Sequence, residues 1–346
     1  MCSISTGNKN TQDKADDGIY PFYVRSQTVE RINSWTFDGE AILTAGDGVG
    51  VGKVFHHSYG KIGVHQRVYI LSDFKCDANY LFHFFSSKFY NRVKRMSAKN
   101  SVDSVRKEMI TDMPLSLPCQ KEQVKIGHML SLLDERIATQ NKIIEDLKKL
   151  KSAIIEIEYT PNAKTTSHIG DIIEQISKRN KNNAIQNVLS VSNRQGFIKQ
   201  SDQFENRNVA SEDTSNYKIV EKNDFAFNPA RINVGSISRL TTFEKGIVSP
   251  MYICFRTQEN VAPEYIDFFF ESKHFYCEIQ KRLEGSVRQC LSFEGLCNIP
   301  ISLPSLEMQQ RIGKRLLTLG QKIKTETDLL ELLNKQKQYL LRQMFI

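Results

Sequence analysis

Three stretches of this 346-residue chain carry residue types that could bind a phosphate, a methyl donor or a metal. The glycine run at residues 46–53 fails the GxGxxG pattern, because Val51 stands at the third glycine. It also fails the P-loop pattern, with Asp47 at the first glycine and Val54 at the Ser/Thr position. A structural turn, a loop beside a DNA backbone and a nucleotide site remain as interpretations, in decreasing order of weight.

The other two stretches do not predict catalysis. Residues 228–231 (NPAR) are similar to the Asn-Pro-Pro-aromatic motif of adenine methyltransferases, but the second proline and the aromatic residue are missing. His56, His57 and His65 have no carboxylate or cysteine at ligand spacing. The seven cysteines are scattered without a CxxC pair, which predicts reduced thiols. We therefore expect no cofactor and no metal, and an enzyme that acts on its own is the weakest interpretation of the chain.

The composition favours a polyanionic partner. Lysine and arginine total 47 against 39 acidic residues, a net charge of +8. The N-terminal residues lack a signal-peptide pattern, and no run approaches the roughly 18 apolar residues of a membrane span, so we expect a cytoplasmic protein without membrane contact. The length predicts two to three domains.

One long segment of the chain occurs twice. Residues 114–118 (PLSLP) and 300–304 (PISLP) each precede a stretch of the same polar and apolar pattern, and the two stretches align without a gap at a separation of 186 residues. Identical residues include Gln123 and Gln309, Gly127 and Gly313, and Leu130 and Leu316. Such a duplication indicates two equivalent halves, which suits a ligand with two halves such as duplex DNA.

Both copies have the spacing of a coiled-coil seam, with steps of four and three. The seam positions are Ile126, Leu130, Leu133, Ile137, Gln140, Ile144, Leu147, Lys151 and Ile154 in the first copy, and Ile312, Leu316, Leu319, Ile323, Glu326, Leu330, Leu333, Lys337 and Leu340 in the second. The polar interruptions therefore recur, and polar seam residues restrict partner choice. We predict two helices of about 40 residues and about 60 Å that pack as an antiparallel coiled coil. The alternative is two unrelated amphipathic helices, each lying on its own domain.

The remaining segments predict mixed α/β domains, and hence an α+β fold class. Residues 64–70 and 247–255 have the pattern of strands, and residues 79–88 and 264–273 that of helices. The two helical stretches share Tyr80 with Tyr265, so the duplication extends into the globular parts. Proline at position 161 predicts that the first long helix ends near Tyr159.

These features together resemble the specificity subunit of type I restriction-modification systems, over essentially the whole chain. The resemblance rests on residues 5–11, 20–26, 46–53, 65–69 and 100–106 of the first module, and on the Leu-Pro, glutamine and Ile-Gly steps at 117–127 and 303–313. Glu122 fits the family pattern before the glutamine, whereas Met308 departs from it. The resemblance implies target-recognition domains at 1–118 and 161–304, with spacer helices at 119–160 and 305–346.

The resemblance also implies a function. A subunit of this kind reads a bipartite site in double-stranded DNA, one half per recognition domain, and is not itself catalytic. Its spacer docks methyltransferase subunits, two in number, and the full complex adds endonuclease/translocase subunits. The alternative from another class is a non-enzymatic coiled-coil scaffold that binds only protein partners.

The first module departs from the second at its start. Nothing in it matches residues 168–173 of the second module, so its N-terminus is apparently short. We expect the first module to be the less stable one.

Basic and amide-bearing residues are the candidates for DNA contact, because arginine and lysine pair with guanine, asparagine and glutamine with adenine, and all of them with phosphate. In the first module these are Arg25, Gln27, Lys53, His65, Gln66, Arg67, Lys99, Asn100 and Arg106. In the second they are Lys178, Arg179, Arg194, Gln195, Arg207, Asn228, Arg231, Asn233 and Arg288. For each one, a solvated surface role is the alternative.

Overall fold

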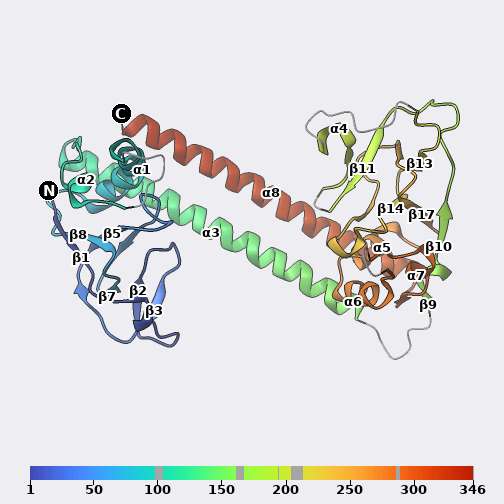
Figure 1. Ribbon diagram of the computed structural model, residues 1–346, viewed down its shortest axis with the longest axis horizontal. Coiled ribbons are helices and arrows are strands. Elements are labelled where there is room, and N and C mark those ends of the chain that lie inside the picture. Colours follow the sequence, from blue (N-terminus) through green and yellow to red (C-terminus); the bar gives the residue numbers. More distant parts are fainter. Residues whose placement is uncertain (98–103, 161–166, 194, 204–212, 286–288, 346) are drawn as a thin grey trace. The chain divides into compact units, whose positions relative to one another are not determined.

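The computed structural model describes residues 1–346 except 98–103, 161–166, 194, 204–212, 286–288 and 346 (Figure 1). The chain divides into two compact units. Unit 1 contains Met1–Lys142 and Asp328–Ile346, and unit 2 contains Ile143–Thr327. Helices α3 (Gln120–Tyr159) and α8 (Leu306–Met344) each contribute to both units. The predicted mixed α/β architecture, with two sheet-containing domains and long helices, is confirmed.

Unit 1 holds two four-stranded sheets. The first has the order β1-β8-β5-β6 and is antiparallel throughout, with β1 (Ser3–Thr6), β8 (Val68–Ser72), β5 (Ala41–Ala45) and β6 (Phe55–Ser58). The second has the order β3-β2-β7-β4, with β3 (Glu30–Ile32), β2 (Tyr20–Tyr23), β7 (Lys61–Val64) and β4 (Phe37–Asp38). Its central pair, β2 and β7, is parallel.

Unit 2 repeats this topology strand for strand. One sheet has the order β10-β17-β14-β15, with β10 (Ile173–Ile176), β17 (Ile253–Thr257), β14 (Phe225–Phe227) and β15 (Ile237–Arg239). The other has the order β12-β11-β16-β13, with β12 (Gly196–Lys199), β11 (Val188–Ser192), β16 (Lys245–Val248) and β13 (Lys218–Glu221), and its central pair is again parallel. A further pair joins β9 (Ser167–His168) to β18 (Pro300–Ile301). The duplication thus includes the sheets, where the two sequences differ most.

Some of the shorter helices also correspond, namely those that lie between the last strand of the four-stranded sheets and the long helix of each unit. Unit 1 has η1 (Thr11–Asp13), α1 (Ala78–Met96) and α2 (Lys107–Thr111); unit 2 has η2 (Ile169–Asp171), α4 (Gln200–Gln203), η3 (Ile232–Val234), α5 (Pro263–Phe269), α6 (Lys273–Arg282) and α7 (Phe293–Cys297). Asp77 begins α1 by accepting a hydrogen bond from Tyr80 N at 2.8 Å. The helix predicted at residues 264–273 is divided, because the Ser272 side chain caps a new helix by accepting from Phe275 N at 3.1 Å.

Two predicted strands are wrong in their bounds. Residues 65–67 form the turn between β7 and β8, and the run at 247–255 contains the turn between β16 and β17. In both cases apolar residues lie on both sides of a tight turn. The pattern therefore resembled one longer strand.

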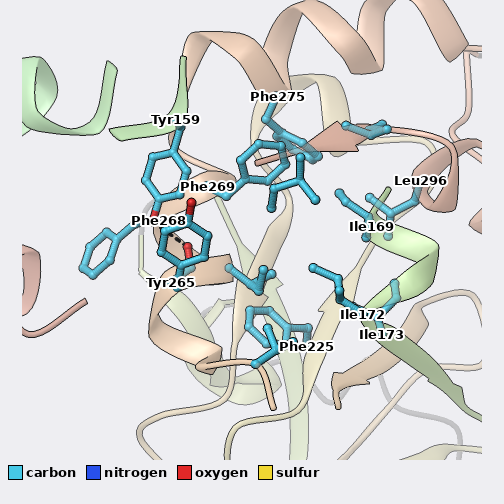
Figure 2. Close-up of a cluster of buried hydrophobic side chains, with 14 of the residues drawn as sticks. Tyr159, Ile169, Ile172, Ile173, Phe225, Tyr265, Phe268, Phe269, Phe275 and Leu296 are labelled. Atoms are coloured by element: carbon cyan, nitrogen blue, oxygen red, sulfur yellow. Dashed lines mark hydrogen bonds between the residues drawn. The ribbon is translucent and has the colours of Figure 1, made fainter. Parts of the chain in front are cut away.

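The core of unit 2 is rich in aromatic residues (Figure 2). Phe225 and Phe255 stack with ring centroids 5.1 Å apart, and Tyr265, Phe269 and Phe275 cluster beside them. Tyr159, the last residue of α3, packs on Tyr265 at 4.8 Å, and its hydroxyl donates to the Tyr265 carbonyl at 2.6 Å. This contact fixes the end of α3 in the core of unit 2.

Each long helix has, near its start, a glutamine that is bound in the same way. Gln123 Oε1 accepts from Asp77 N at 3.0 Å, and its Nε2 donates to the Pro118 carbonyl at 2.8 Å. In unit 2, Gln309 accepts from Ala262 N at 2.9 Å and donates to the Pro304 carbonyl at 2.9 Å. The repeated glutamine therefore attaches the start of each long helix to the helix region of its own domain.

Candidate nucleic-acid interface

In unit 1, loops from several elements meet around Asp47, between β5 and β6. Arg25 Nη1, from the β2–β3 hairpin, lies 3.0 Å from Asp47 Oδ1, and Arg67 Nε, from the β7–β8 turn, lies 3.6 Å from Asp47 Oδ2. Val105 N, from the segment before α2, donates to the Gly46 carbonyl at 2.7 Å. The structure thus brings together two candidate arginines that are 42 residues apart in the chain.

These two arginines remain available to a ligand. The Arg25 side chain is 45% exposed and that of Arg67 is 66% exposed, while one carboxylate balances only one of the two positive charges. Gln66, next to Arg67 in the chain, extends the surface. Its Nε2 donates to Asn10 Oδ1 at 2.6 Å. Gln27 and Arg106 are also exposed. We regard this surface, built on Arg25, Asp47, Gln66 and Arg67, as the loop cluster of unit 1.

The glycine run gives the loop cluster its shape. Gly52 has a φ of +66°, which favours glycine, and a Cβ at Gly50 would lie 2.3 Å from the Arg25 carbonyl oxygen. The run is therefore a tight turn that packs against the β2–β3 hairpin. Lys53 is the last residue of the run, and its Nζ lies 5.1 Å from the centre of the Tyr90 ring.

His65 supports the backbone of this surface. Its side chain is buried, and its Nδ1 accepts a hydrogen bond from Arg67 N at 3.0 Å. Burial lowers the pKa of His65, and the charge of Arg25 lowers it further. A neutral imidazole therefore holds the backbone that carries Arg67.

Unit 2 has a corresponding set of loops. Ser236 Oγ, from the β14–β15 loop, donates to the Val191 carbonyl at 3.2 Å, and Leu291 N donates to the Pro229 carbonyl at 3.1 Å. The candidates Gln195, Asn228, Arg231 and Asn233 lie on the β11–β12 and β14–β15 loops. Asn228 Oδ1 accepts from Ala230 N at 3.1 Å, so this amide also shapes its own turn.

A basic hollow of about 710 Å³ adjoins β13 and β16 of unit 2. Its lining includes Lys178, Arg179, Lys181, Asn182 and Lys245. Asn180 also lines it but is mostly buried, and its side chain bonds to both the carbonyl and the amide of Ile185 at 3.0 and 3.2 Å. The loop around Asn180 thus has a defined conformation, and several cationic side chains line the hollow.

Some functional candidates were missed and others cannot be placed. Asp47, Lys181 and Lys245 were not predicted; the run of polar residues after Lys178 could have signalled Lys181, but Lys245 joins the hollow only through the fold. The candidates Lys99, Asn100, Arg194, Arg207 and Arg288 lie outside the described residues.

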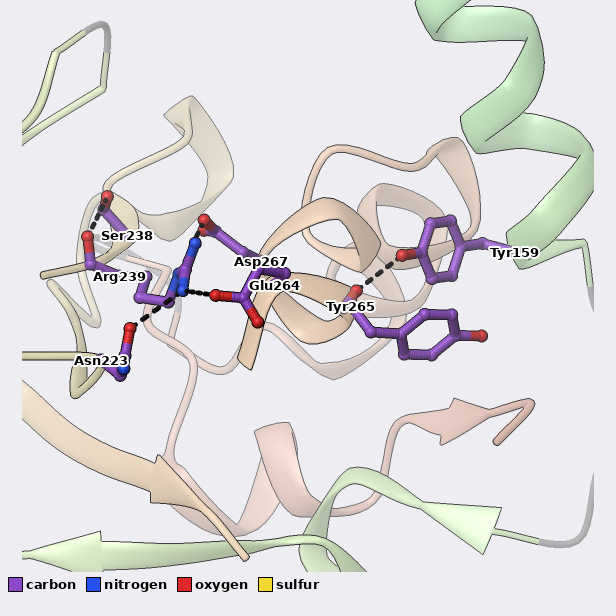
Figure 3. A network of polar contacts seen from close by, with 7 residues as sticks. All are labelled: Tyr159, Asn223, Ser238, Arg239, Glu264, Tyr265 and Asp267. Carbon is purple, nitrogen blue, oxygen red and sulfur yellow. Dashed lines mark hydrogen bonds and ion pairs between the residues drawn. The ribbon is translucent and has the colours of Figure 1, made fainter. Parts of the chain in front are cut away.

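A buried ionic network in unit 2 connects a strand to a helix (Figure 3). The Arg239 side chain is 5% exposed and binds Asp267 at 3.2 Å, Asn223 at 2.9 Å and Glu264. These bonds join β15 to α5, and the two carboxylates share one guanidinium. Within the described ranges, no cluster of three or more histidine, cysteine or acidic residues could hold a metal ion. No helix in the same part of the chain is long and apolar enough to cross a membrane.

Comparison with known proteins identifies relatives of this chain. The specificity subunit of the type I restriction enzyme EcoDI of Escherichia coli is 27% identical over 159 residues, which are 45% of this chain and 35% of that protein. The chain therefore spans about a third of that relative's length. The MjaVIII specificity subunit of Methanocaldococcus jannaschii is 25% identical over 371 residues, covering 95% of this chain and 84% of that one.

The fold agrees with a solved structure. The type I restriction-modification S subunit from M. genitalium superposes with a TM-score of 0.67 at 16% identity, over 100% of this chain and 94% of that one. The model of the type I restriction modification DNA specificity domain matches residues 1–149 and 161–335. With both halves of the sequence matched, the chain belongs to the type I restriction modification DNA specificity domain family.

Proposed function

We propose that this chain is the DNA sequence-specificity subunit of a type I restriction-modification complex. The observation that carries the proposal is the occurrence, in a member of this family, of two domains with one topology and different basic loops. Shared topology gives both domains the same means of approaching a duplex. Different side chains on the loops give each domain its own base preference, because base edges are discriminated by side-chain contacts.

In this proposal the recognition domains are residues 1–118 and 161–304, and each reads one half of a bipartite site. The loop cluster of unit 1 supports this role through Arg25 and Arg67, and the basic hollow of unit 2 supports it through Lys178 and Arg179. Phosphate contacts supply affinity that falls with salt, whereas base contacts supply discrimination. The loops of unit 2 that carry Gln195, Asn228, Arg231 and Asn233 add to the proposed interface. The candidates outside the described residues belong to the proposal on their residue types alone.

The spacer helices, residues 119–160 and 305–346, form an antiparallel coiled coil in this proposal. Within unit 1, Asp134 of α3 pairs with Lys337 of α8. Within unit 2, Glu158 of α3 lies 3.3 Å from Arg315 of α8. An early residue of one helix thus meets a late residue of the other in both units, and the seam positions are buried or half-buried. These contacts support helices that run in opposite directions.

The spacer also docks two methyltransferase subunits, and endonuclease/translocase subunits join them in the full complex. Large apolar side chains lie exposed on both helices, which supports a protein partner: Ile157 is 76% exposed, and Leu332 and Tyr339 are each 62% exposed. The chain contributes recognition to such a complex, and its partners contribute catalysis.

The proposal is tested by titrating fluorescent duplex DNA with the chain in the presence of its methyltransferase partner at several salt concentrations. We expect binding that weakens linearly in log-log form as salt rises, and a preference for one bipartite sequence over scrambled DNA. A complex that forms with the methyltransferase but does not bind DNA would instead support the protein-only scaffold.

A further inference from the structure

Asp47 places a carboxylate at the centre of a surface that is otherwise suited to a polyanion. It belongs to the loop cluster of unit 1, where Arg25 and Arg67 both lie against it, and its side chain is 26% exposed. A carboxylate beside a DNA phosphate is unfavourable, because like charges repel. Affinity for the DNA backbone therefore does not account for an aspartate at this position.

The backbone around Asp47 is held in place by hydrogen bonds from two other segments. Gly46 N donates to the Arg67 carbonyl at 2.8 Å, and the Gly46 carbonyl accepts from Val105 N at 2.7 Å. The Tyr69 hydroxyl in turn donates to the Val105 carbonyl at 3.0 Å. The carboxylate thus follows a residue that is bound on both sides, which limits the positions that its side chain can take.

The glycine run brings both arginine-bearing segments close to this carboxylate. A Cβ on Gly46 would lie 2.9 Å from the Arg67 carbonyl oxygen. A Cβ on Gly50 would lie 2.3 Å from the Arg25 carbonyl oxygen. Both distances are too short for a side chain, so a glycine is needed at each place for the backbones to approach. The run therefore serves an arrangement in which one carboxylate lies between two guanidinium groups.

An arginine that a carboxylate orients is well suited to read a base edge. Arg25 donates to Asp47 from Nη1 at 3.0 Å, and Arg67 faces the same carboxylate with Nε at 3.6 Å. A guanidinium has five N–H donors, so each arginine keeps donors for a ligand. Guanine offers O6 and N7, which together accept two hydrogen bonds from one arginine. A side chain that is oriented in advance also loses less conformational freedom on binding.

We propose that Asp47 is a positioning residue for guanine recognition, which orients Arg25 and Arg67 toward guanine edges in the half-site that residues 1–118 read. The inference rests on the proposed function and names a base of that half-site. Asp47 also repels phosphate, which disfavours the use of the two arginines as backbone contacts. The β14–β15 loop of unit 2, residues 228–236 (NPARINVGS), contains no acidic residue, so the two domains differ at this place.

The experiment measures binding of the complex with the methyltransferase to its duplex target, in which 7-deazaguanine replaces one guanine at a time. This base lacks the N7 acceptor. We expect the wild type to lose at least about fivefold in affinity at one or two guanines of a single half-site. Asp47→Ala should bind the unmodified target more weakly by a similar factor and lose little further at those guanines. It should bind scrambled DNA at least as well as the wild type, because both arginines can then bind phosphate.

Two further variants separate orientation from charge. Asp47→Asn keeps a hydrogen-bond acceptor for Arg25 without the negative charge, and should lose less discrimination at the same guanines than Asp47→Ala. Asp38→Ala removes an exposed carboxylate of β4, which pairs with the start of β7, whereas the loop cluster follows the end of that strand. This control should bind every duplex like the wild type, and thermal melts verify that all variants fold.

Three results would overturn the inference and leave the proposed function intact. The first is a wild-type complex that binds a bipartite target but tolerates 7-deazaguanine throughout the half-site that is retained when residues 161–304 are exchanged. The second is an Asp47→Ala complex that remains as sensitive to 7-deazaguanine as the wild type. The third is an equal loss of binding to target and scrambled DNA in Asp47→Ala, which would make Asp47 a structural residue. A wild-type complex without sequence preference would overturn the proposed function as well.

Discussion

Asp134 on α3 and Lys337 on α8 form an ion pair within unit 1, and their side chains are 32% and 28% exposed. Lys337 is one of the polar seam residues, so the ion pair gives that interruption a partner on the other helix. Its counterpart in the duplication, Lys151, instead pairs with Glu271 at 2.6 Å and lies over the Phe268 ring. The two matched interruptions therefore have different partners.

Replacing Lys337 should weaken the contact between the two helices in unit 1. We expect Lys337→Ala to lower the free energy of unfolding by about 1 kcal/mol, since the pair is partly exposed. Urea titration measures this effect, and a double-mutant cycle with Asp134→Asn isolates the pair. Lys335→Ala, which removes an exposed pair with Glu331 on the same helix, is the control and should leave the midpoint unchanged. Equal effects of the two alanine variants would contradict a role for Lys337 at the helix contact.

His83 should make unit 1 sensitive to acid. Burial lowers its pKa to about 4, despite the nearby Asp134 carboxylate. The unfolded chain, with an ordinary pKa near 6.5, binds this proton first as pH falls, so the stabilisation present above about pH 6.5 is lost progressively towards pH 4. Between pH 7 and pH 5 the loss should be about 2 kcal/mol.

The matched variant for this prediction is His83→Phe, because Phe268 occupies the corresponding position of unit 2. Urea titrations at pH 7 and pH 5 should show a smaller loss of stability in the variant than in the wild type. An identical pH dependence in both chains would show that another group is responsible.

Gln123 should be needed to attach α3 to its domain. Gln123→Ala leaves the partly buried Asp77 amide without its acceptor, which should cost about 1–3 kcal/mol in unit 1. Gln309→Ala should have a similar effect in unit 2, because Gln309 makes the same pair of bonds. Hydrogen exchange resolves the two units, and the exposed Gln321→Ala is the control. A uniform loss of protection in both units after either change would argue against this local attachment.

Much of the fold could be predicted because the long helices carry a periodic seam and because the sequence repeats. The corresponding topology of the sheets could not, since β2 and β7 pair across a long stretch of chain without a local signal. The predicted strand bounds were wrong at turns, as at His65, because apolar residues flank a tight turn there. In the candidate interface, the residue types predicted Arg25 and Arg67 as two separate candidates for DNA contact. Their shared contact with Asp47 arises only from tertiary structure.

Arg67 should contribute to DNA binding more than to stability. Its side chain is 66% exposed, so Arg67→Ala should change the stability by less than about 0.5 kcal/mol. In the assembled complex the variant should lose about 1–3 kcal/mol of discrimination at one base pair if Arg67 reads a base, or about one unit of salt slope if it binds phosphate. DNA titrations at several salt concentrations separate these outcomes.

Lys222→Ala is the control for Arg67. Lys222 precedes β14, at the end of that strand opposite to the β14–β15 loop, and pairs with Glu244 at 2.5 Å. This variant should bind DNA like the wild type. Equal losses in both variants would mean that only the net charge of the chain matters.

The most direct test is to exchange residues 161–304 for the corresponding segment of a relative with a different target, and to map methylated adenines in cells that carry the chain and its partners. Independent reading by two domains predicts a new sequence in one half of the target, with the other half and the gap between them unchanged. Methylation in which both halves have changed would contradict the account.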